Sequence, residues 1–288
     1  MIKKCVIPAA GFGTRFLPIT KAVPKELLPI IDKPALAYIV DEAIEAGIEK
    51  ICIIISSIKE DIKRYFGDNV VLEKFLSNKN KFSELNYIKS LYKEVEITYV
   101  YQEEQLGLGH AILQAKDFVG SDDFAVLLGD DVYVADHCAI GQLIEAYQKV
   151  NATILGTQIV PLVEASKYGV CIPKDVNNPS NIIELAGVVE KPKNPPSQST
   201  ISGRYILTNA IFDYLSTQTK GAGDEIQLTD AVLRLMGQQK VYAYNILGKR
   251  YDIGSKIGYV EAIIDFGLAR EDLKVEVESL LQKKLSNK

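Results

Sequence analysis

The chain has 288 residues, of which 47% are hydrophobic and 24% charged, and its 33 basic and 37 acidic side chains give a net charge of −4. This length and apolar content allow one large α/β domain with a substantial core, and they exclude general disorder. The nearly balanced charge gives no sign of a nucleic-acid surface. Any phosphate group must therefore be bound by local side chains.

Four cysteines, Cys5, Cys52, Cys138 and Cys171, are scattered without a Cys-x-x-Cys pair, so neither a zinc site nor a disulfide framework is indicated. Two of them lie in apolar runs typical of strands, where buried reduced thiols are expected. We recognise no secretory leader, and no apolar run approaches the roughly 20 residues of a membrane helix. We therefore expect a reduced, cytoplasmic protein with no membrane contact.

Apolar periodicity predicts that strands and helices alternate through the first half of the chain. Strands are expected at 4–8, 50–55, 96–101 and 124–128, and helices at 35–46, 59–66 and 109–118. This alternation is typical of a doubly wound, mostly parallel Rossmann-like sheet. Ligands of such sheets lie at the carboxyl ends of the strands.

The second half is predicted to add strands, turns and a smaller lobe. Residues 68–94 are polar, rich in lysine and helix-like, which indicates an insertion on the outside. Beyond it we expect strands at 153–161 and 201–207, strands and turns at 163–189, a loop at 194–200, a helix at 209–217 and an amphipathic helical tail from about 258. Such a tail packs on a neighbouring subunit or on its own core. Neither a repeat nor a linker is evident, so we expect one domain.

A glycine loop follows the first expected strand. Gly11 and Gly13 would allow backbone N–H groups to approach phosphate oxygens, while Arg15 offers a planar fork of donors and Lys25 a point charge. The loop lacks the Gly-Lys-Ser/Thr of a Walker loop, and Phe16 stands where a Rossmann fingerprint needs its third glycine. A lone Gly-x-Gly is compatible with an ordinary tight turn. With the two cations, the segment is a plausible cradle for a nucleoside triphosphate.

The motifs GFGTRF at 11–16 and KAVPKELLP at 21–29 resemble the signature of sugar-1-phosphate nucleotidylyltransferases, and the resemblance continues to about residue 258. The KAVPKE form favours the uridylyl branch of that family. The resemblance implies a Mg²⁺-dependent enzyme that converts UTP and α-D-glucose 1-phosphate to UDP-glucose and pyrophosphate. It also implies a nucleotide-binding half at 1–135, a sugar-binding half at 136–257, a helical tail at 258–288, and a homodimer or homotetramer.

Three alternatives remain. The enzyme could use dTTP or another sugar 1-phosphate, because uracil and thymine present the same edge and a methyl group contributes only a few kcal/mol to discrimination. The chain could be a non-catalytic paralogue that binds nucleotide sugar and regulates a partner, although the residues expected for catalysis are present. A Rossmann dehydrogenase is disfavoured by the broken glycine pattern.

Two aspartate segments are candidates for a metal site. Asp130 and Asp131 end an expected buried strand, where carboxylates are costly unless they bind a cation or donors, and Asp252 lies in a distant glycine-rich turn. Each aspartate alone is as easily a turn residue or a helix cap. Oxygen ligands from two such segments, together with triphosphate oxygens, suit Mg²⁺. The family resemblance assigns the metal to Asp130 and Asp252 and leaves Asp131 open.

The implied reaction is attack by a sugar phosphate oxygen on the α-phosphorus of UTP. This nucleophile is already an anion, so alignment and charge neutralisation matter more than a general base. His110 and His137 are the only histidines of the chain, and neither belongs to an evident triad. We assign Arg15 to the leaving β- and γ-phosphates and Lys25 to the region of the α-phosphate.

The remaining assignments follow the resemblance. A glutamine amide can both donate and accept, so Gln102 can recognise the imide edge of a pyrimidine, with Gln105 as a substitute. The sugar and its phosphate are assigned to Glu190 and Lys191, and Asp224 is a candidate helix cap. The other nucleotide residues are Ala9, Ala10, Gly11, Gly13, Thr14 and Gly107, and the glycines expected to approach the hexose are Gly169 and Gly203.

Overall fold

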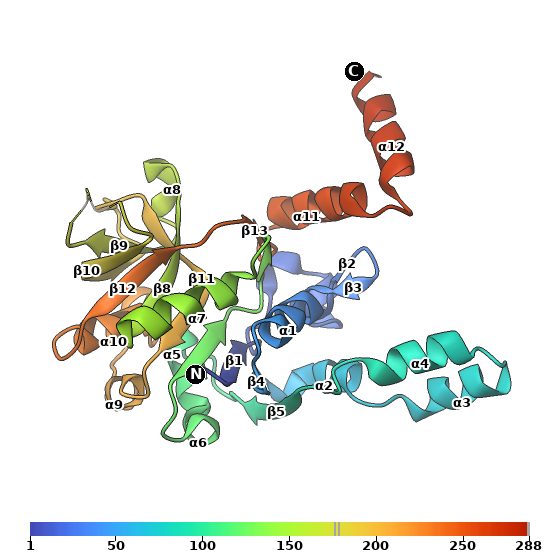
Figure 1. Ribbon diagram of the computed structural model, residues 1–288, viewed down its shortest axis with the longest axis horizontal. Helices are drawn as coiled ribbons and strands as arrows, with labels where there is room; N and C mark the ends of the chain where they lie inside the picture. The colour runs from blue at the N-terminus through green and yellow to red at the C-terminus, as the bar shows by residue number, and fades with distance from the viewer. Residues whose placement is uncertain (176, 178, 287–288) are drawn as a thin grey trace.

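The computed structural model describes residues 1–175, 177 and 179–286, and its centre is a nine-stranded sheet in the order β5-β4-β1-β6-β11-β8-β12-β10-β9 (Figure 1). Most of the predicted strands are present within two or three residues of their expected bounds. The strands of this sheet are β1 (Lys4–Pro8), β4 (Lys50–Ile55), β5 (Glu96–Tyr101), β6 (Phe124–Leu127), β8 (Thr153–Ile159), β9 (Gly169–Pro173), β10 (Ile182–Glu190), β11 (Ser199–Leu207) and β12 (Val241–Asn245).

The sheet is mixed, so the expectation of a mostly parallel sheet is right only for its first four strands. β5, β4, β1 and β6 are parallel, and β12 is parallel to β8. β11 is antiparallel to both β6 and β8, and β10 is antiparallel to β12 and β9. The link from β9 to β10 is shorter than the dozen or more residues that a parallel crossover needs, so these two strands pair antiparallel. The α/β class is confirmed.

Helices cover both faces of the sheet because its central strands are apolar on both faces. Along β1, Cys5 and Ile7 belong to the hydrophobic cluster under α1 and α7, while Val6 belongs to the cluster under α5, α9 and α10. The helices that contribute to the two clusters are α1 (Ala35–Glu45), α2 (Glu60–Phe66), α5 (Leu108–Gln114), α6 (Lys116–Val119), α7 (Ala139–Val150), α9 (Ile211–Leu215) and α10 (Leu228–Leu235).

Several local expectations change in detail. The helix expected at 109–118 is divided at Ala115 into α5 and α6, α10 is the helix expected after Asp224, and α7 and β12 come from segments without a sequence-based assignment. Asp224 does not cap the helix that follows it, because Gln227 occupies the N-cap position of α10. The carboxylate of Asp224 instead accepts from Lys220 at 2.8 Å. The helix cap prediction for Asp224 was therefore wrong.

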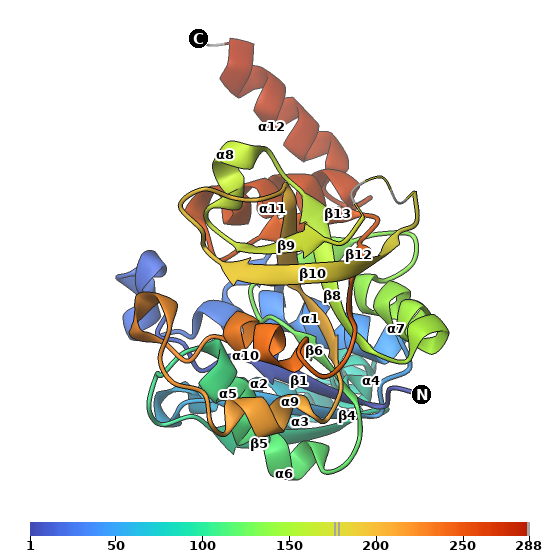
Figure 2. The ribbon, with the colours of Figure 1, turned by 90° about the vertical axis from the view of Figure 1, so that its left-hand side faces the viewer.

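Two helical pairs extend from the body (Figures 1 and 2). The insertion forms α3 (Val70–Asn78) and α4 (Phe82–Ser90), and the tail forms α11 (Lys256–Ala269) and α12 (Lys274–Ser286). A short helix, α8 (Leu162–Ala165), lies beside β9. Within the described residues, no helix combines the length and apolar character needed to span a bilayer.

A buried ion pair joins β11 to α1. Arg204 of β11 has no exposed surface, and its Nε and Nη2 atoms donate to the two carboxylate oxygens of Glu42 in α1 at 2.9 and 2.7 Å. The same carboxylate accepts from the backbone N–H of Ile140 in the first turn of α7 at 2.8 Å. Arg204 also donates to the carbonyl oxygen of Asp131 at 2.7 Å. Burial opposes the charge of Arg204, but Glu42 outweighs it and raises the pKa of the guanidinium.

The substitution Glu42→Leu should lower the free energy of unfolding by about 3–5 kcal/mol, because it leaves the guanidinium of Arg204 buried without a counter-ion. Urea unfolding followed by circular dichroism measures the loss. Asp61→Asn is the matched control, since it breaks the exposed Asp61–Arg64 pair and should change stability by at most about 0.5 kcal/mol. Equal effects of the two substitutions would contradict the role given to the buried pair.

Candidate active site

Two adjoining cavities lie at the carboxyl ends of the parallel strands, where ligands of such sheets bind. They share Leu108 and Glu225 in their walls. The smaller, of about 350 Å³, is lined among others by the predicted nucleotide residues Ala10, Gly11, Gly13, Thr14, Lys25, Gln102 and Gly107. The larger, of about 780 Å³, is lined among others by the remaining predicted residues except Ala9, which are Arg15, Asp130, Gly169, Glu190, Lys191, Gly203 and Asp252.

The glycine loop connects β1 to three short 3₁₀ turns rather than to a helix. These are η1 (Thr14–Phe16), η2 (Ile19–Lys21) and η3 (Lys25–Leu27). Gly13 has a φ of +65°, which favours glycine. A methyl group added to Gly11 would meet no protein atom within 4 Å. Packing therefore does not require a glycine at Gly11, and the space beside it is open to a ligand.

The two predicted cations of this loop contact the metal-ligand segments. Arg15 donates to the carbonyl oxygen of Gly254 at 3.1 Å, and Nζ of Lys25 lies 2.6 Å from Oδ2 of Asp130. Burial alone would lower the pKa of Lys25, but Asp130 and Glu26 outweigh it and raise that pKa. Burial likewise opposes ionisation of Asp130, and Lys25 nevertheless lowers its pKa. Both groups are therefore charged at neutral pH.

The two aspartates assigned to the metal come together through a strand pair that the sequence did not reveal. β7 (Asp131–Val134) runs antiparallel to β13 (Lys249–Asp252), with Asp131 opposite Asp252. A Cβ built on Gly254 would lie 2.8 Å from Oδ2 of Asp130 and 3.1 Å from Oδ1 of Asp252. Two carboxylates thus converge on one small space beside a glycine.

This donor set fits Mg²⁺ that is shared with a substrate. Among the described residues, no group of three or more acidic, histidine or cysteine side chains is arranged to hold a metal by itself. Mg²⁺ in phosphoryl-transfer sites is commonly held by one or two carboxylates, with the remaining ligands supplied by phosphate oxygens and water. Asp130 and Asp252 meet that requirement.

Asp131 has a different partner from Asp130. It is 3% exposed, and its Oδ1 accepts from Nε of Arg250 at 2.6 Å. Burial raises the pKa of Asp131 to about 6, against the opposing effect of Arg250. Gly203 has a φ of +78°, and a methyl group there would lie 2.1 Å from Oδ2 of Asp131. Gly203 lines the larger cavity as expected, but in this structure its missing side chain makes room for Asp131.

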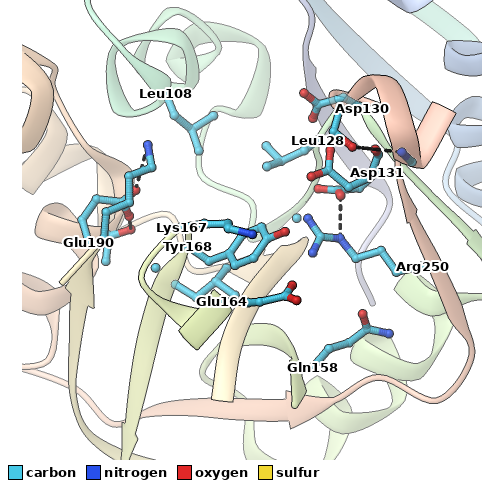
Figure 3. Close-up of a pocket in the computed structure, with 18 of the residues that line it drawn as sticks. Leu108, Leu128, Asp130, Asp131, Gln158, Glu164, Lys167, Tyr168, Glu190 and Arg250 are labelled. Atoms are coloured by element: carbon cyan, nitrogen blue, oxygen red, sulfur yellow. Dashed lines mark hydrogen bonds and ion pairs between the residues drawn. The ribbon is translucent and has the colours of Figure 1, made fainter. Parts of the chain in front are cut away.

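Arg250 is a cleft residue to which sequence reasoning assigned no role. Its guanidinium lies 5.2 Å from the ring centre of Tyr168, and Figure 3 shows it next to both Tyr168 and Asp131. A signal was available, because side chains two positions apart on a strand share a face. Because Asp252 was expected to face the site, Arg250 could have been expected to face it as well.

Glu190 is the last residue of β10 and lies on the opposite wall from Asp130 and Asp131 (Figure 3), and Lys191 follows it directly. Oε2 of Glu190 accepts from the hydroxyl of Thr229 at 2.6 Å, and Nζ of Lys191 lies 3.5 Å from Oε1 of Glu190. Gly169 pairs with Glu190 across β9 and β10. A methyl group at Gly169 would come within 3.1 Å of Oε2 of Glu190, so this glycine keeps space around the carboxylate.

Gln102 and Gly107 lie next to each other in the smaller cavity. Gln102 is 4% exposed, and its Nε2 donates to the carbonyl oxygen of Gly107 at 3.2 Å. Gln105 also lines this cavity, but its amide nitrogen donates to the backbone carbonyl of Gln102. Gly107 has a φ of +108°, and a methyl group there would lie 2.9 Å from the carbonyl oxygen of Ile226. Packing against Ile226 therefore also requires a glycine here.

A second buried ion pair supports the loop from below and was not predicted. Nζ of Lys59 lies 2.7 Å from Oε2 of Glu26 and donates to the carbonyl oxygen of Ala9 at 2.7 Å. Burial raises the pKa of Glu26 and lowers that of Lys59, and each group opposes the shift of the other. Ala9 is thus not among the residues that line the cavity, and its carbonyl oxygen is bound by Lys59. Glu26 belongs to a recognisable motif, whereas nothing near Lys59 in the sequence indicated this contact.

Comparison with known proteins identifies the family of this chain. The nucleotidyl transferase family matches residues 4–267. The UTP–glucose-1-phosphate uridylyltransferase of Staphylococcus epidermidis is 47% identical over 283 residues, which cover 98% of each chain. The chain therefore belongs to the nucleotidyl transferase family.

Two solved structures share this fold closely. The UTP-bound UGPase from Acinetobacter baumannii superimposes with a TM-score of 0.90 at 39% identity, covering 98% of this chain and 99% of its own. A UDP-glucose pyrophosphorylase complexed with UDP-glucose has a TM-score of 0.85 at 41% identity and covers 94% of this chain and all of its own.

Two glycine substitutions should separate packing from ligand binding. Gly203→Ala combines a positive φ with a clash against Asp131, so it should lower the free energy of unfolding by about 1–3 kcal/mol or more. Gly11→Ala should leave stability unchanged within about 0.5 kcal/mol and weaken nucleotide binding, because its methyl group enters the smaller cavity. Thermal unfolding and calorimetric UTP titration measure the two effects. A destabilised Gly11→Ala variant that binds UTP normally would contradict this assignment.

Proposed function

We propose that this chain transfers the uridylyl group of UTP to α-D-glucose 1-phosphate, forming UDP-glucose and pyrophosphate. One observation carries the proposal: the 2.6 Å contact between Lys25 and Asp130 joins a residue of the smaller cavity to one of the larger. A nucleotide in the first cavity and a sugar phosphate in the second would meet at this contact. The names of the relatives support the same reaction.

In this proposal the smaller cavity binds the nucleotide. Gln102 and Gly107 face the base, and the backbone of Ala9, Ala10 and Gly11 forms the floor under it. Gly13 and Thr14 lead the triphosphate toward the two cations of the loop. Arg15 neutralises the β- and γ-phosphates that leave as pyrophosphate, and Lys25 neutralises the α-phosphate.

The larger cavity binds the sugar phosphate. Glu190 accepts hydrogen bonds from sugar hydroxyls, and Lys191 neutralises the phosphate whose oxygen attacks. Gly169 keeps the approach to Glu190 open. An anionic nucleophile needs no general base, so the protein contributes alignment and positive charge to a direct in-line displacement. Lys25 exchanges its bond to Asp130 for bonds to the α-phosphate when UTP arrives.

Asp130 and Asp252 would hold the Mg²⁺. When bound, the ion supplies positive charge that offsets the charge developing on the leaving pyrophosphate. The tight contact between Lys25 and Asp130 keeps this carboxylate ionised and ready to ligate. Arg15, bonded to Gly254 beside both aspartates, holds the loop against the same point.

We further propose one domain with a nucleotide half at 1–135, a sugar half at 136–257 and a tail at 258–288 that contributes to a homodimer or homotetramer. The continuous sheet supports a single domain. Exposed apolar side chains on the tail helices, such as Ile257 and Val275, support a subunit contact. Four buried free thiols suit a reducing cytoplasm.

Pyrophosphate release with Mg²⁺ and glucose 1-phosphate should be fastest with UTP among UTP, dTTP, CTP, ATP and GTP. Lys25→Ala and Asp130→Ala should each lower kcat by about 100-fold or more, because each removes charge compensation at the transferred phosphate. A coupled pyrophosphate assay measures the rates. Faster release with dTTP would move the chain to the thymidylyl branch, and UDP-glucose binding without turnover would favour the regulatory paralogue.

Removal of divalent metal should abolish turnover and leave the fold intact, since the carboxylates of Asp130 and Asp252 have protein donors of their own in its absence. Excess EDTA followed by stepwise addition of MgCl₂ should restore the rate. Asp252→Asn should raise the Mg²⁺ concentration at half-maximal rate by about tenfold or more. Full activity in EDTA would exclude the metal role.

A further inference from the structure

Lys59 is a buried lysine to which the proposed reaction gives no role. It ends η4 (Ser57–Lys59), a short turn between β4 and α2, and it is 3% exposed. Its ammonium donates to Oε2 of Glu26 and to the carbonyl oxygen of Ala9, both at 2.7 Å. An apolar pair of similar size would fill this space without the cost of removing two charges from water. Packing alone therefore does not account for a lysine here.

The two partners of Lys59 belong to two different segments of the candidate active site. Ala9 directly follows β1 and leads into the glycine loop, whereas Glu26 lies in η3. A charged group that bonds to both segments at once fixes how far apart they lie, and hydrogen bonds to a charged group are the strong ones. Lys59 therefore ties the glycine loop to η3.

The geometry of η3 links Glu26 to Lys25. A 3₁₀ turn has about three residues per turn, so neighbouring side chains point about 120° apart. Glu26 is buried, whereas Lys25 reaches Oδ2 of Asp130 at 2.6 Å. A rotation of η3 that moved one of these side chains would also move the other. Holding Glu26 in place therefore sets the direction of Lys25.

The stem of Lys25 is bordered by the other segment that Lys59 holds. A methyl group added to Gly13 would lie 3.1 Å from Cβ of Lys25 and 3.2 Å from its Cγ, so the glycine loop lies directly against this stem. Lys59 holds that loop through Ala9 and holds η3 through Glu26. One buried ammonium thus supports both segments that meet at Lys25.

We propose that Lys59 is a positioning residue for Lys25: its ammonium holds Glu26 and the glycine loop together and thereby keeps the ammonium of Lys25 at the junction of the two cavities. The inference rests on the proposed function, because it takes Lys25 as the residue that neutralises the α-phosphate of UTP. Lys59 itself lines neither cavity. Its effect on the rate is exerted through Lys25, whose misplacement by about 1 Å would slow the reaction strongly.

The test is a double-mutant cycle in kcat/KM for UTP, at saturating glucose 1-phosphate and Mg²⁺. Lys59→Met keeps an unbranched side chain and removes the ammonium donors. It should lower kcat/KM by about tenfold or more, because the charge of Lys25 no longer meets the α-phosphate correctly. In the Lys25→Ala background the same change should cost at most about threefold, because the group that Lys59 positions is already absent.

A second variant keeps the test decisive if Lys59→Met is unstable. That substitution leaves Glu26 buried without a counter-ion and should lower Tm. Lys59→Met combined with Glu26→Met removes both charges and should recover most of the lost Tm, because an apolar pair suits a buried site. Its kcat/KM should stay about tenfold or more below that of the wild type, since apolar contacts lack the direction of the two hydrogen bonds.

Lys4→Met is the matched control. Lys4 also pairs with a carboxylate, that of Asp122 at 2.8 Å, and donates to the backbone carbonyl oxygen of Val119 at 2.8 Å. It lies at the opposite end of β1 from the glycine loop. Its loss should therefore leave kcat/KM within about twofold of the wild type, whatever its effect on Tm.

Equal losses from Lys59→Met in the two backgrounds would overturn the proposal and leave Lys59 a packing role. The same holds if the doubly apolar variant regains kcat/KM together with Tm. Calorimetric titration of UTP through the same cycle gives the coupling without turnover, with weaker binding expected only where Lys25 is present. A wild type that binds UTP but transfers nothing would overturn the proposed function, and this titration would still test Lys59.

Discussion

The position of the catalytic cleft depends on one buried charge, the guanidinium of Arg204. A charge with no exposed surface is tolerated only when it is paired and hydrogen-bonded. Arg204 meets this condition through Glu42 and the carbonyl oxygen of Asp131, and Glu42 also holds the start of α7. Arg204 of β11 thus fixes the positions of α1, α7 and β7.

The fixed position of β7 also determines where the acidic side chains of the cleft lie. The backbone carbonyl oxygen of Asp131 accepts a hydrogen bond from Arg204, and its side-chain carboxylate accepts one from Arg250. Asp131 also faces Asp252 in the β7–β13 pair. The neighbouring Asp130 and the distant Asp252 therefore converge beside Gly254 because the backbone between them is held. Preorganised charge of this kind is the main source of catalysis in phosphoryl transfer.

The glycine loop is held in a similar way. Lys59 and Glu26 form a buried pair beneath it, and the carbonyl of Ala9 is part of that pair. Lys25 turns the other way and reaches Asp130. Adjacent residues of one motif therefore differ in what they contact, since Glu26 supports the loop and Lys25 lines the smaller cavity.

Local pattern determined much of what could be predicted. The apolar runs of β1, β4 and β5 and the motifs with Arg15 and Lys25 are carried by neighbouring residues, so the sequence by itself defines them. The residues that the family resemblance singled out, apart from Ala9 and Asp224, line the two cavities. Tertiary structure alone decided the mixed sheet, the β7–β13 pair and the partner of Asp131. Each of these features depends on contacts between residues far apart in the chain or on the burial of a charge. A local sequence pattern contains no information about either.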